Sequence, residues 1–203
     1  MKTLTAIATA GVLTISAMSA QASVVFDLTG KNVNSQDMSF NEGSIGLTAS
    51  SGTVRHGNIS TGGKLTQTSD GLGVYSHRRD SDGLDSTWNN EAIVFVFDQI
   101  VSLTDVNLSL FDKYGKWGDD WSFFFDTDSD GDLDRVFRYE KSNPYSFDTP
   151  YVGTTFAIAA EGAKDNFRIH DLTVAASAVP EPSSLLLLGA GLVVAAAGRR
   201  KRA

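Results

Sequence analysis

Short apolar and aromatic runs recur along the middle of the chain, separated by clusters of Gly, Asn, Asp and Ser. No part of residues 23–178 shows a sustained helical period. The runs are typical of β-strands and fall at 24–28, 45–49, 53–59, 73–76, 92–98, 101–110, 121–126, 135–139, 154–159 and 166–174. About ten strands without an internal repeat predict an all-β fold, a jelly-roll-like β-sandwich rather than a propeller.

Three runs carry finer detail. Within 106–110, apolar residues alternate with polar ones, as expected for a strand with one buried face. Residues 93–97 are apolar on both faces, which predicts a central strand. In 166–174 the alternation slips at Asp171, which predicts a β-bulge.

Three other segments predict loops and turns, namely 25–37, 62–63 and 71–73. The last has the sequence Gly-Leu-Gly, but it lacks the third glycine and the following helix of a dinucleotide site. A turn is therefore the expected structure there.

The N-terminal residues 1–22 have the pattern of a secretory signal peptide. Lys2 precedes an apolar region, 7–18, and the segment closes with Ala-Gln-Ala at 20–22, an A-x-A cleavage pattern. The mature chain is then expected to begin at Ser23. A retained N-terminal anchor is the alternative, and the polar residues within the apolar region disfavour it.

The last 25 or so residues combine three parts in a fixed order. Two prolines flank Glu181 and hold the chain extended, a form that suits a protease or transpeptidase cleft. Residues 183–198 are apolar all round and predict a transmembrane helix of minimal length. The basic tail 199–203 then places the C-terminus in the cytoplasm and the body outside. The alternative is a buried C-terminal helix of the globular domain, but that helix would need a polar face.

This ending, 179–203, resembles the PEP-CTERM sorting signal of Gram-negative bacteria. The resemblance implies recognition by an exosortase, a membrane-embedded cysteine protease or transpeptidase, in bacteria that also make exopolysaccharide. It implies a precursor anchored in the inner membrane with a periplasmic body, destined for the cell surface or extracellular matrix. It rests on a sorting motif and a membrane-end basic cluster, which are Val179, Pro180, Glu181 and Pro182, and Arg199, Arg200, Lys201 and Arg202.

The net charge of residues 23–178 restricts the classes of partner that the body can bind. Residues 23–178 hold 12 of the 17 basic residues and 23 of the 24 acidic residues, a net charge of about −11. This charge argues against nucleic acid and anionic lipid, and it favours divalent cations or neutral glycans. The chain has no cysteine, so the core or bound ions must supply the stability that disulfides give other exported domains.

The strongest motif of the body is the acidic run 126–134. Its aspartates and Gly131 follow the order of the calcium loop D-x-D-x-D-G, but Phe137 stands where an EF-hand has Glu. Because both flanks predict strands, the run is similar to the calcium-binding hairpins of integrin-type and thrombospondin-type repeats. The expected role is a structural metal clip, and a solvated acidic hairpin tip is the alternative. The expected ligands are Asp126, Asp128, Asp130, Asp132 through its carbonyl, and Asp134.

A weaker acidic pattern covers 80–85 and is followed by Glu91. Short Asp and Gly clusters mark turns generally, so an acidic turn is favoured over a second cation site. Aromatic residues also gather near 111–121. There Tyr114 and Trp117 either stack on sugar rings or belong to the core, whereas Trp121 is expected in the core.

Catalytic arrangements are scarce in this sequence. It has no cysteine, no G-x-S-x-G and no H-E-x-x-H, and its three histidines lie far apart. The sequence therefore predicts a non-catalytic, calcium-binding structural or glycan-associated module. One alternative is a carbohydrate-active enzyme on a jelly roll, which needs a cleft with paired acids. The other is a surface adhesin for a protein partner, which needs an exposed apolar patch.

Overall fold

The computed structural model describes residues 22–112, 114, 118–128 and 130–177, and these residues form 13 strands and no helix. In chain order the strands are β1 (Ser23–Asp27), β2 (Val33–Ser35), β3 (Asp37–Glu42), β4 (Ile45–Arg55), β5 (Asn58–Thr61), β6 (Lys64–Thr68), β7 (Gly71–Tyr75), β8 (Leu84–Asp85), β9 (Asn90–Ser109), β10 (Trp121–Phe125), β11 (Asp134–Glu140), β12 (Tyr145–Ala159) and β13 (Asn166–Ala176).

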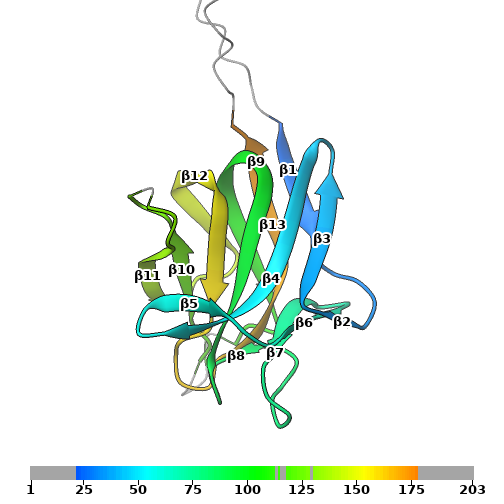
Figure 1. Cartoon of the computed structure of the whole chain (residues 1–203), viewed down its shortest axis with the longest axis vertical. Coiled ribbons are helices and arrows are strands. Elements are labelled where there is room, and N and C mark those ends of the chain that lie inside the picture. Colours follow the sequence, from blue (N-terminus) through cyan, green and yellow to red (C-terminus); the bar gives the residue numbers. More distant parts are fainter. Residues whose placement is uncertain (1–21, 113, 115–117, 129, 178–203) are drawn as a thin grey trace, which may run out of the picture.

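All the strands pair antiparallel within one large sheet (Figure 1). The main path runs β11-β10-β12-β9-β13-β7-β6-β2, with β3, β4 and β5 joined through β9, and β1 and β8 joined through β13. The predicted all-β fold is confirmed.

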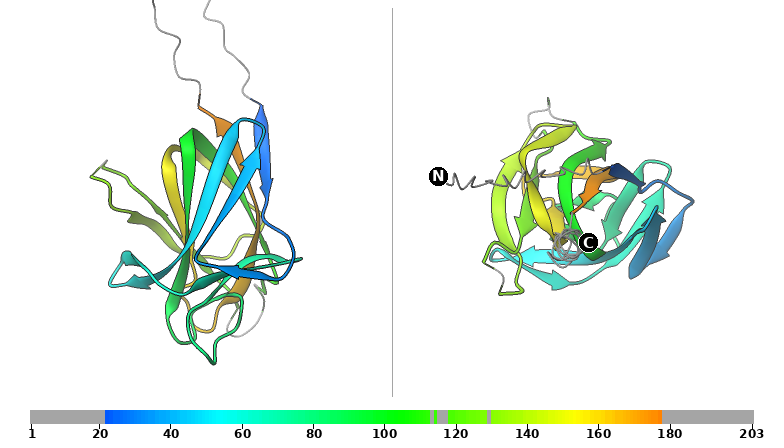
Figure 2. Two further views of the ribbon diagram at one scale, coloured as in Figure 1. Left: turned by 45° about the vertical axis from the view of Figure 1, so that its right-hand side comes forward. Right: turned by 90° about the horizontal axis from the view of Figure 1, so that it is seen from above.

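The long strand β9 creates the two layers of the fold. Its residues 90–97 pair with β4 and its residues 101–109 pair with β13, while β12 follows its other edge. Strands β4 and β13 therefore leave the same edge of β9, and the sheet curls over itself (Figure 2). The Phe26 ring of β1 meets the Phe97 ring of β9 edge to face, 5.6 Å between centroids. The runs 92–98 and 101–110 are thus one strand that changes partners.

The main core fills the space between the layers and takes apolar side chains from nearly every strand. Strand β9 is central, as predicted, with Ile93, Phe95 and Phe97 buried on its inner face. Its outer face is only partly covered. A smaller apolar group, which we call the outer cluster, lies there and comprises Val54, Ala92, Phe124, Ala157 and Ala159, with Ile59, Val94 and Leu133 packed against it.

The loop predictions are partly wrong. Residues 71–73 belong to β7, because their glycines serve close backbone approach rather than a turn. A Cβ on Gly71 would lie 2.2 Å from the Ile169 carbonyl oxygen, and one on Gly73 would lie 2.2 Å from the Asp82 oxygen. Strand β2 lies inside the predicted loop 25–37. The bulge is confirmed, since the β13 register shifts between Ile169 and Asp171.

The two ends of the described chain lie side by side. Ser23 is the register partner of Ala175, so β1 begins where β13 ends. Both ends leave the sheet at one pole, and β7 and β8 lie toward the opposite pole (Figures 1 and 2).

The predicted signal peptide, apart from residue 22, lies outside the described residues. So do the sorting motif 179–182, the predicted transmembrane helix 183–198 and the basic tail 199–203. Within the described part of the chain, no helix is long and apolar enough to cross a membrane.

Candidate functional site

The acidic loop joins β10 to β11 at the edge of the sheet and folds back on its first carboxylate. The Gly131 N–H donates to Asp126 Oδ2 at 3.1 Å, and Gly131 has φ +95°, which favours glycine. The Asp130 N–H donates to Asp128 Oδ1 at 3.3 Å. One carboxylate oxygen each of Asp126, Asp128 and Asp130 lies within 4.8 Å of the others. The loop therefore brings three of the predicted ligands together.

The other two predicted ligands have different surroundings. Asp134 Oδ2 accepts the Thr127 hydroxyl at 2.5 Å and the Thr127 N–H at 3.2 Å. These bonds hold the pKa of Asp134 below its usual range, the hydroxyl contributing most. Asp132 is exposed and lines a neighbouring groove.

The base of the loop is fixed to the sheet. Leu133 packs against the outer cluster, and Arg135 Nε donates to Glu161 Oε2 at 2.8 Å. The Arg135 guanidinium also lies 5.4 Å from the centroid of the Phe124 ring. Arg138 reaches the same buried Glu161 carboxylate at 3.8 Å. The start of strand β11 is therefore held in place by both ion pairing and packing.

A groove of about 560 Å³ lies beside the loop on the outer face of the sheet. Its polar lining consists largely of hydroxyl and amide side chains, and Asp132 is the one carboxylate among its lining residues. A second hollow, about 390 Å³, shares Gly131 and Thr155 with it. The groove is lined by Ser50, Ser51, Gly52, Asn58, Ile59, Thr61, Val94, Gly131, Asp132, Leu133 and Thr155.

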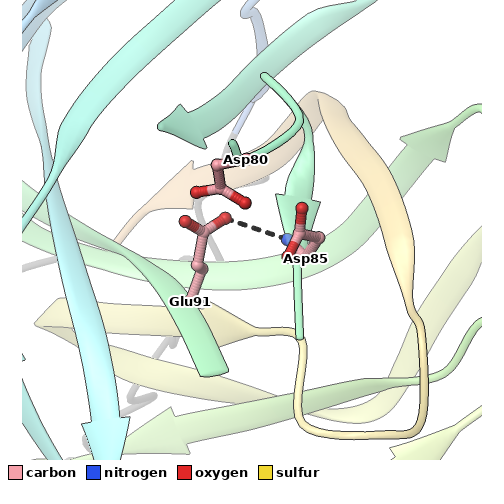
Figure 3. A group of neighbouring side chains, drawn as sticks. All are labelled: Asp80, Asp85 and Glu91. Atoms are coloured by element: carbon pink, nitrogen blue, oxygen red, sulfur yellow. Dashed lines mark hydrogen bonds between the residues drawn. The ribbon is translucent and has the colours of Figure 1, made fainter. Parts of the chain in front are cut away.

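A second group of carboxylates gathers between β7 and β9 and is shown in Figure 3. Asp80 lies in the β7–β8 connection, Asp85 ends β8, and Glu91 is near the start of β9. One oxygen of each lies within 4.8 Å of the others. Glu91 is 0% exposed and Asp85 is 2% exposed, so this buried triad, as we call the three residues, is far less accessible than the acidic loop.

Hydrogen bonds satisfy only part of the buried triad. Asp80 Oδ2 accepts the Ser76 N–H at 2.8 Å, the Ser76 hydroxyl at 3.0 Å and the His77 N–H at 3.1 Å. Glu91 Oε2 accepts the Asp85 N–H at 3.0 Å. Glu91 Oε1 and Asp80 Oδ1 are buried and have no hydrogen-bond partner within the described chain.

Burial shifts the acidities of the triad. Desolvation raises the pKa of Glu91 to about 9, and it also raises the pKa of Asp85. For Asp80, desolvation acts upward, but hydrogen bonds from the Ser76 N–H, then from the side chains of Glu91, Asp85 and Ser76, outweigh it and leave the pKa below its usual range.

The sequence favoured an acidic turn at 80–85 over a second cation site. The hydrogen-bonded turn lies earlier, where the Asp80 N–H donates to the His77 carbonyl at 2.9 Å, and residues 82–83 form a bend before β8. The sequence placed Glu91 after this acidic pattern and offered a second cation site as the less favoured alternative, without predicting which carboxylates would meet. Their meeting depends on where β8 lies relative to β9, and the local spacing does not encode that position.

The structure describes two of the three aromatic residues named in the prediction for 111–121. Tyr114 is 86% exposed, Trp117 lies outside the described residues, and Trp121 is buried in the core as expected. Trp88, which sequence reasoning did not single out, is 54% exposed and stacks on His77 with 5.2 Å between ring centroids.

Comparison with known families finds one match. Residues 178–202 match the model of the PEP-CTERM protein-sorting motif, which confirms the resemblance drawn from the sequence. The motif implies an exported protein that is anchored in the membrane before processing by exosortase, a membrane protein. No curated protein and no solved structure matches the chain.

Proposed function

Because residues 178–202 carry the PEP-CTERM sorting motif, we propose that this chain is an exosortase-sorted protein of the cell envelope or extracellular matrix. Its body, 23–178, is a non-catalytic structural module that binds calcium and associates with glycans such as exopolysaccharide. The family match at the C-terminus is the observation that carries this proposal.

The position of the chain ends supports sorting of this kind. The register pair Ser23 and Ala175 puts both ends of the body at one pole. In the anchored precursor the C-terminal segment then holds that pole near the membrane.

The acidic loop supports calcium binding. Three carboxylates within 4.8 Å offer the hard oxygen ligands that calcium prefers. Without a cation these like charges repel each other at the hairpin tip. A bound ion would hold the loop of the β10–β11 hairpin together, in a domain that has no cysteine to form a disulfide.

The groove supports glycan binding rather than catalysis. Its hydroxyl and amide groups, with Ile59, Val94 and Leu133 among them, offer the mixture of hydrogen bonds and apolar contacts that sugar rings require. A glycosidase needs two acids flanking its substrate. Asp132 is the single carboxylate on the groove lining, and Glu91, whose pKa is raised, is buried away from it.

Replacement of Glu181 tests the sorting proposal. In cells that contain the exosortase, the Glu181→Ala precursor should stay in the membrane fraction at its full length, whereas the wild-type chain is processed. The matched control is Glu42→Ala, which removes an exposed carboxylate at the end of β3 and should be processed normally. Normal processing of Glu181→Ala would contradict the proposal.

A further inference from the structure

We propose that Asp80, Asp85 and Glu91 form a second calcium site, buried and separate from the acidic loop, which fixes the β7–β9 connection to the sheet. This site is additional to the proposed function and depends on a different set of residues. Figure 3 shows the Glu91 carboxylate directed at the other two acids.

The unpaired oxygens are the first argument. Glu91 is fully buried, yet its Oε1 has no hydrogen-bond partner, and neither has the buried Asp80 Oδ1. Buried polar atoms in native proteins nearly always have partners, so two orphan acceptors in one cluster need an explanation. Either a cation between the carboxylates or a proton shared by Glu91 and Asp80 would satisfy both.

Charge is the second argument. None of the ion pairs found in the described chain includes a carboxylate of the triad, although Asp82, between Asp80 and Asp85 in sequence, pairs with Arg168 at 3.0 Å. Arg168 is directed elsewhere, to Thr66 Oγ1 at 3.2 Å and the Gly71 carbonyl at 3.1 Å. Buried carboxylates without a positive partner are costly. Either a proton or a metal ion must compensate the charge.

The chemistry of the donors favours calcium. All the available donors are oxygens, and calcium accepts six to eight of them at about 2.3–2.6 Å in variable geometry. One oxygen of each carboxylate lies within 4.8 Å of the others, close enough for the three to share one ion. Magnesium usually keeps several waters in a strict octahedron, which a site this buried has little room for.

The ion would order a specific part of the surface. Asp80 holds the backbone of Ser76 and His77, and the His77 ring stacks on Trp88. Asn89 Nδ2 also donates to the Ser76 hydroxyl at 3.1 Å. Calcium at the triad would therefore keep the exposed Trp88 in place, at the pole opposite the chain ends.

The test uses the full-length chain in nonionic detergent and counts bound calcium by calorimetry after dialysis against chelator. The variant Asp128→Asn with Asp130→Asn disables the acidic loop and leaves the triad intact. We expect this loop variant to retain one calcium per chain. If it binds none, the buried site does not exist, and if it prefers magnesium, the assignment to calcium is wrong.

Glu91→Gln separates a metal from a proton. Glutamine has the shape of a protonated glutamate, so in a triad held by a shared proton it should leave calcium binding and the melting temperature unchanged. In a calcium site it removes a charged ligand. Even substitutions outside the ligand shell weaken metal binding about 10- to 100-fold, so this variant should weaken it at least 100-fold. Placed on the loop variant, it should abolish the remaining calcium binding, and unchanged binding would overturn the proposal.

The experiment distinguishes an absent acidic-loop site from an absent buried site. If wild type and the loop variant bind the same amount of calcium, the acidic loop is not a metal site, and the buried site stands. Trp88 fluorescence gives an independent readout. It should respond to calcium in the loop variant and should stop responding once Glu91→Gln is added, with Trp88→Phe identifying its share of the signal.

Discussion

Arg135 and Glu161 join β11 to the β12–β13 connection through a two-point ion pair, with Nε donating to Oε2 at 2.8 Å and the second guanidinium nitrogen contacting Oε1. Glu161 is buried, so its charge depends on this partner. The pair lies directly after the acidic loop, and it anchors both the loop and one wall of the groove.

Loss of the ion pair between Arg135 and Glu161 should lower the stability of the fold. Arg135→Ala leaves a buried carboxylate with only the more distant Arg138, and we expect the free energy of unfolding to fall by about 3 kcal/mol. Arg138→Ala is the matched control, because that guanidinium is more exposed and 3.8 Å away, and it should cost under about 1 kcal/mol. Urea unfolding of both variants measures the difference, and equal costs would show that the closer pair has no special role.

Calcium should stabilise the wild-type chain through the acidic loop. Thermal unfolding with calcium and with chelator should show a smaller calcium-dependent rise in Tm for Asp128→Ala with Asp130→Ala than for wild type. In chelator the same variant should be at least as stable as wild type, because it removes repelling charges. Asp148→Ala, an exposed carboxylate on β12, is the control and should keep the full calcium response.

As the pH rises from about 4 to 6, the free energy of unfolding should fall because of Asp165. Burial, followed by the charge of Asp120, raises the pKa of Asp165 from 3.8 to about 6. Within this range the folded state keeps a proton that the unfolded state has released, so unfolding becomes easier as pH rises. The contribution is present below pH 3.8 and is lost by about pH 6, on the order of 3 kcal/mol at most.

Asp165→Asn removes the titrating group and so tests this prediction. Chelated samples exclude effects of bound metal. The variant loses part of the hydrogen bonding to the Asp120 and Gly162 N–H groups, so its overall stability should drop. Its slope of stability against pH should nevertheless flatten over this range. An unchanged slope would assign the pH dependence to other groups.

Gly71 should tolerate no side chain. Its φ is +116°, and a Cβ would lie 2.2 Å from the backbone oxygen of Ile169, which cannot move without displacing β13. We expect Gly71→Ala to cost at least about 3 kcal/mol. Gly43→Ala is the control, because its φ is +61° with open space around it, so it should cost only about 1 kcal/mol. Equal unfolding midpoints for the two variants would contradict this account of β7.

The sequence located the strands that carry short runs of apolar and aromatic residues, such as β10, β11 and β13. It missed β3 and β6, because each is mostly polar and places few apolar residues inward, Met38 in one and Leu65 in the other. Nothing local marks such strands, since they are held by pairing with neighbours distant in the sequence.

The same contrast separates the sites. The carboxylates of the acidic loop are close in sequence, so their spacing alone predicted that they would converge. Glu91 meets Asp80 and Asp85 only because the sheet places β8 and β9 together, which spacing does not reveal. The sorting signal could be recognised directly because its meaning lies in the linear order of its residues.

The most direct test of the central claim is the intact mass of the mature protein recovered from a host that contains the exosortase. Sorting through the C-terminal motif predicts a chain that begins at Ser23 and lacks the basic cluster Arg199 to Arg202. A mature protein that still carries the complete C-terminus would contradict exosortase processing.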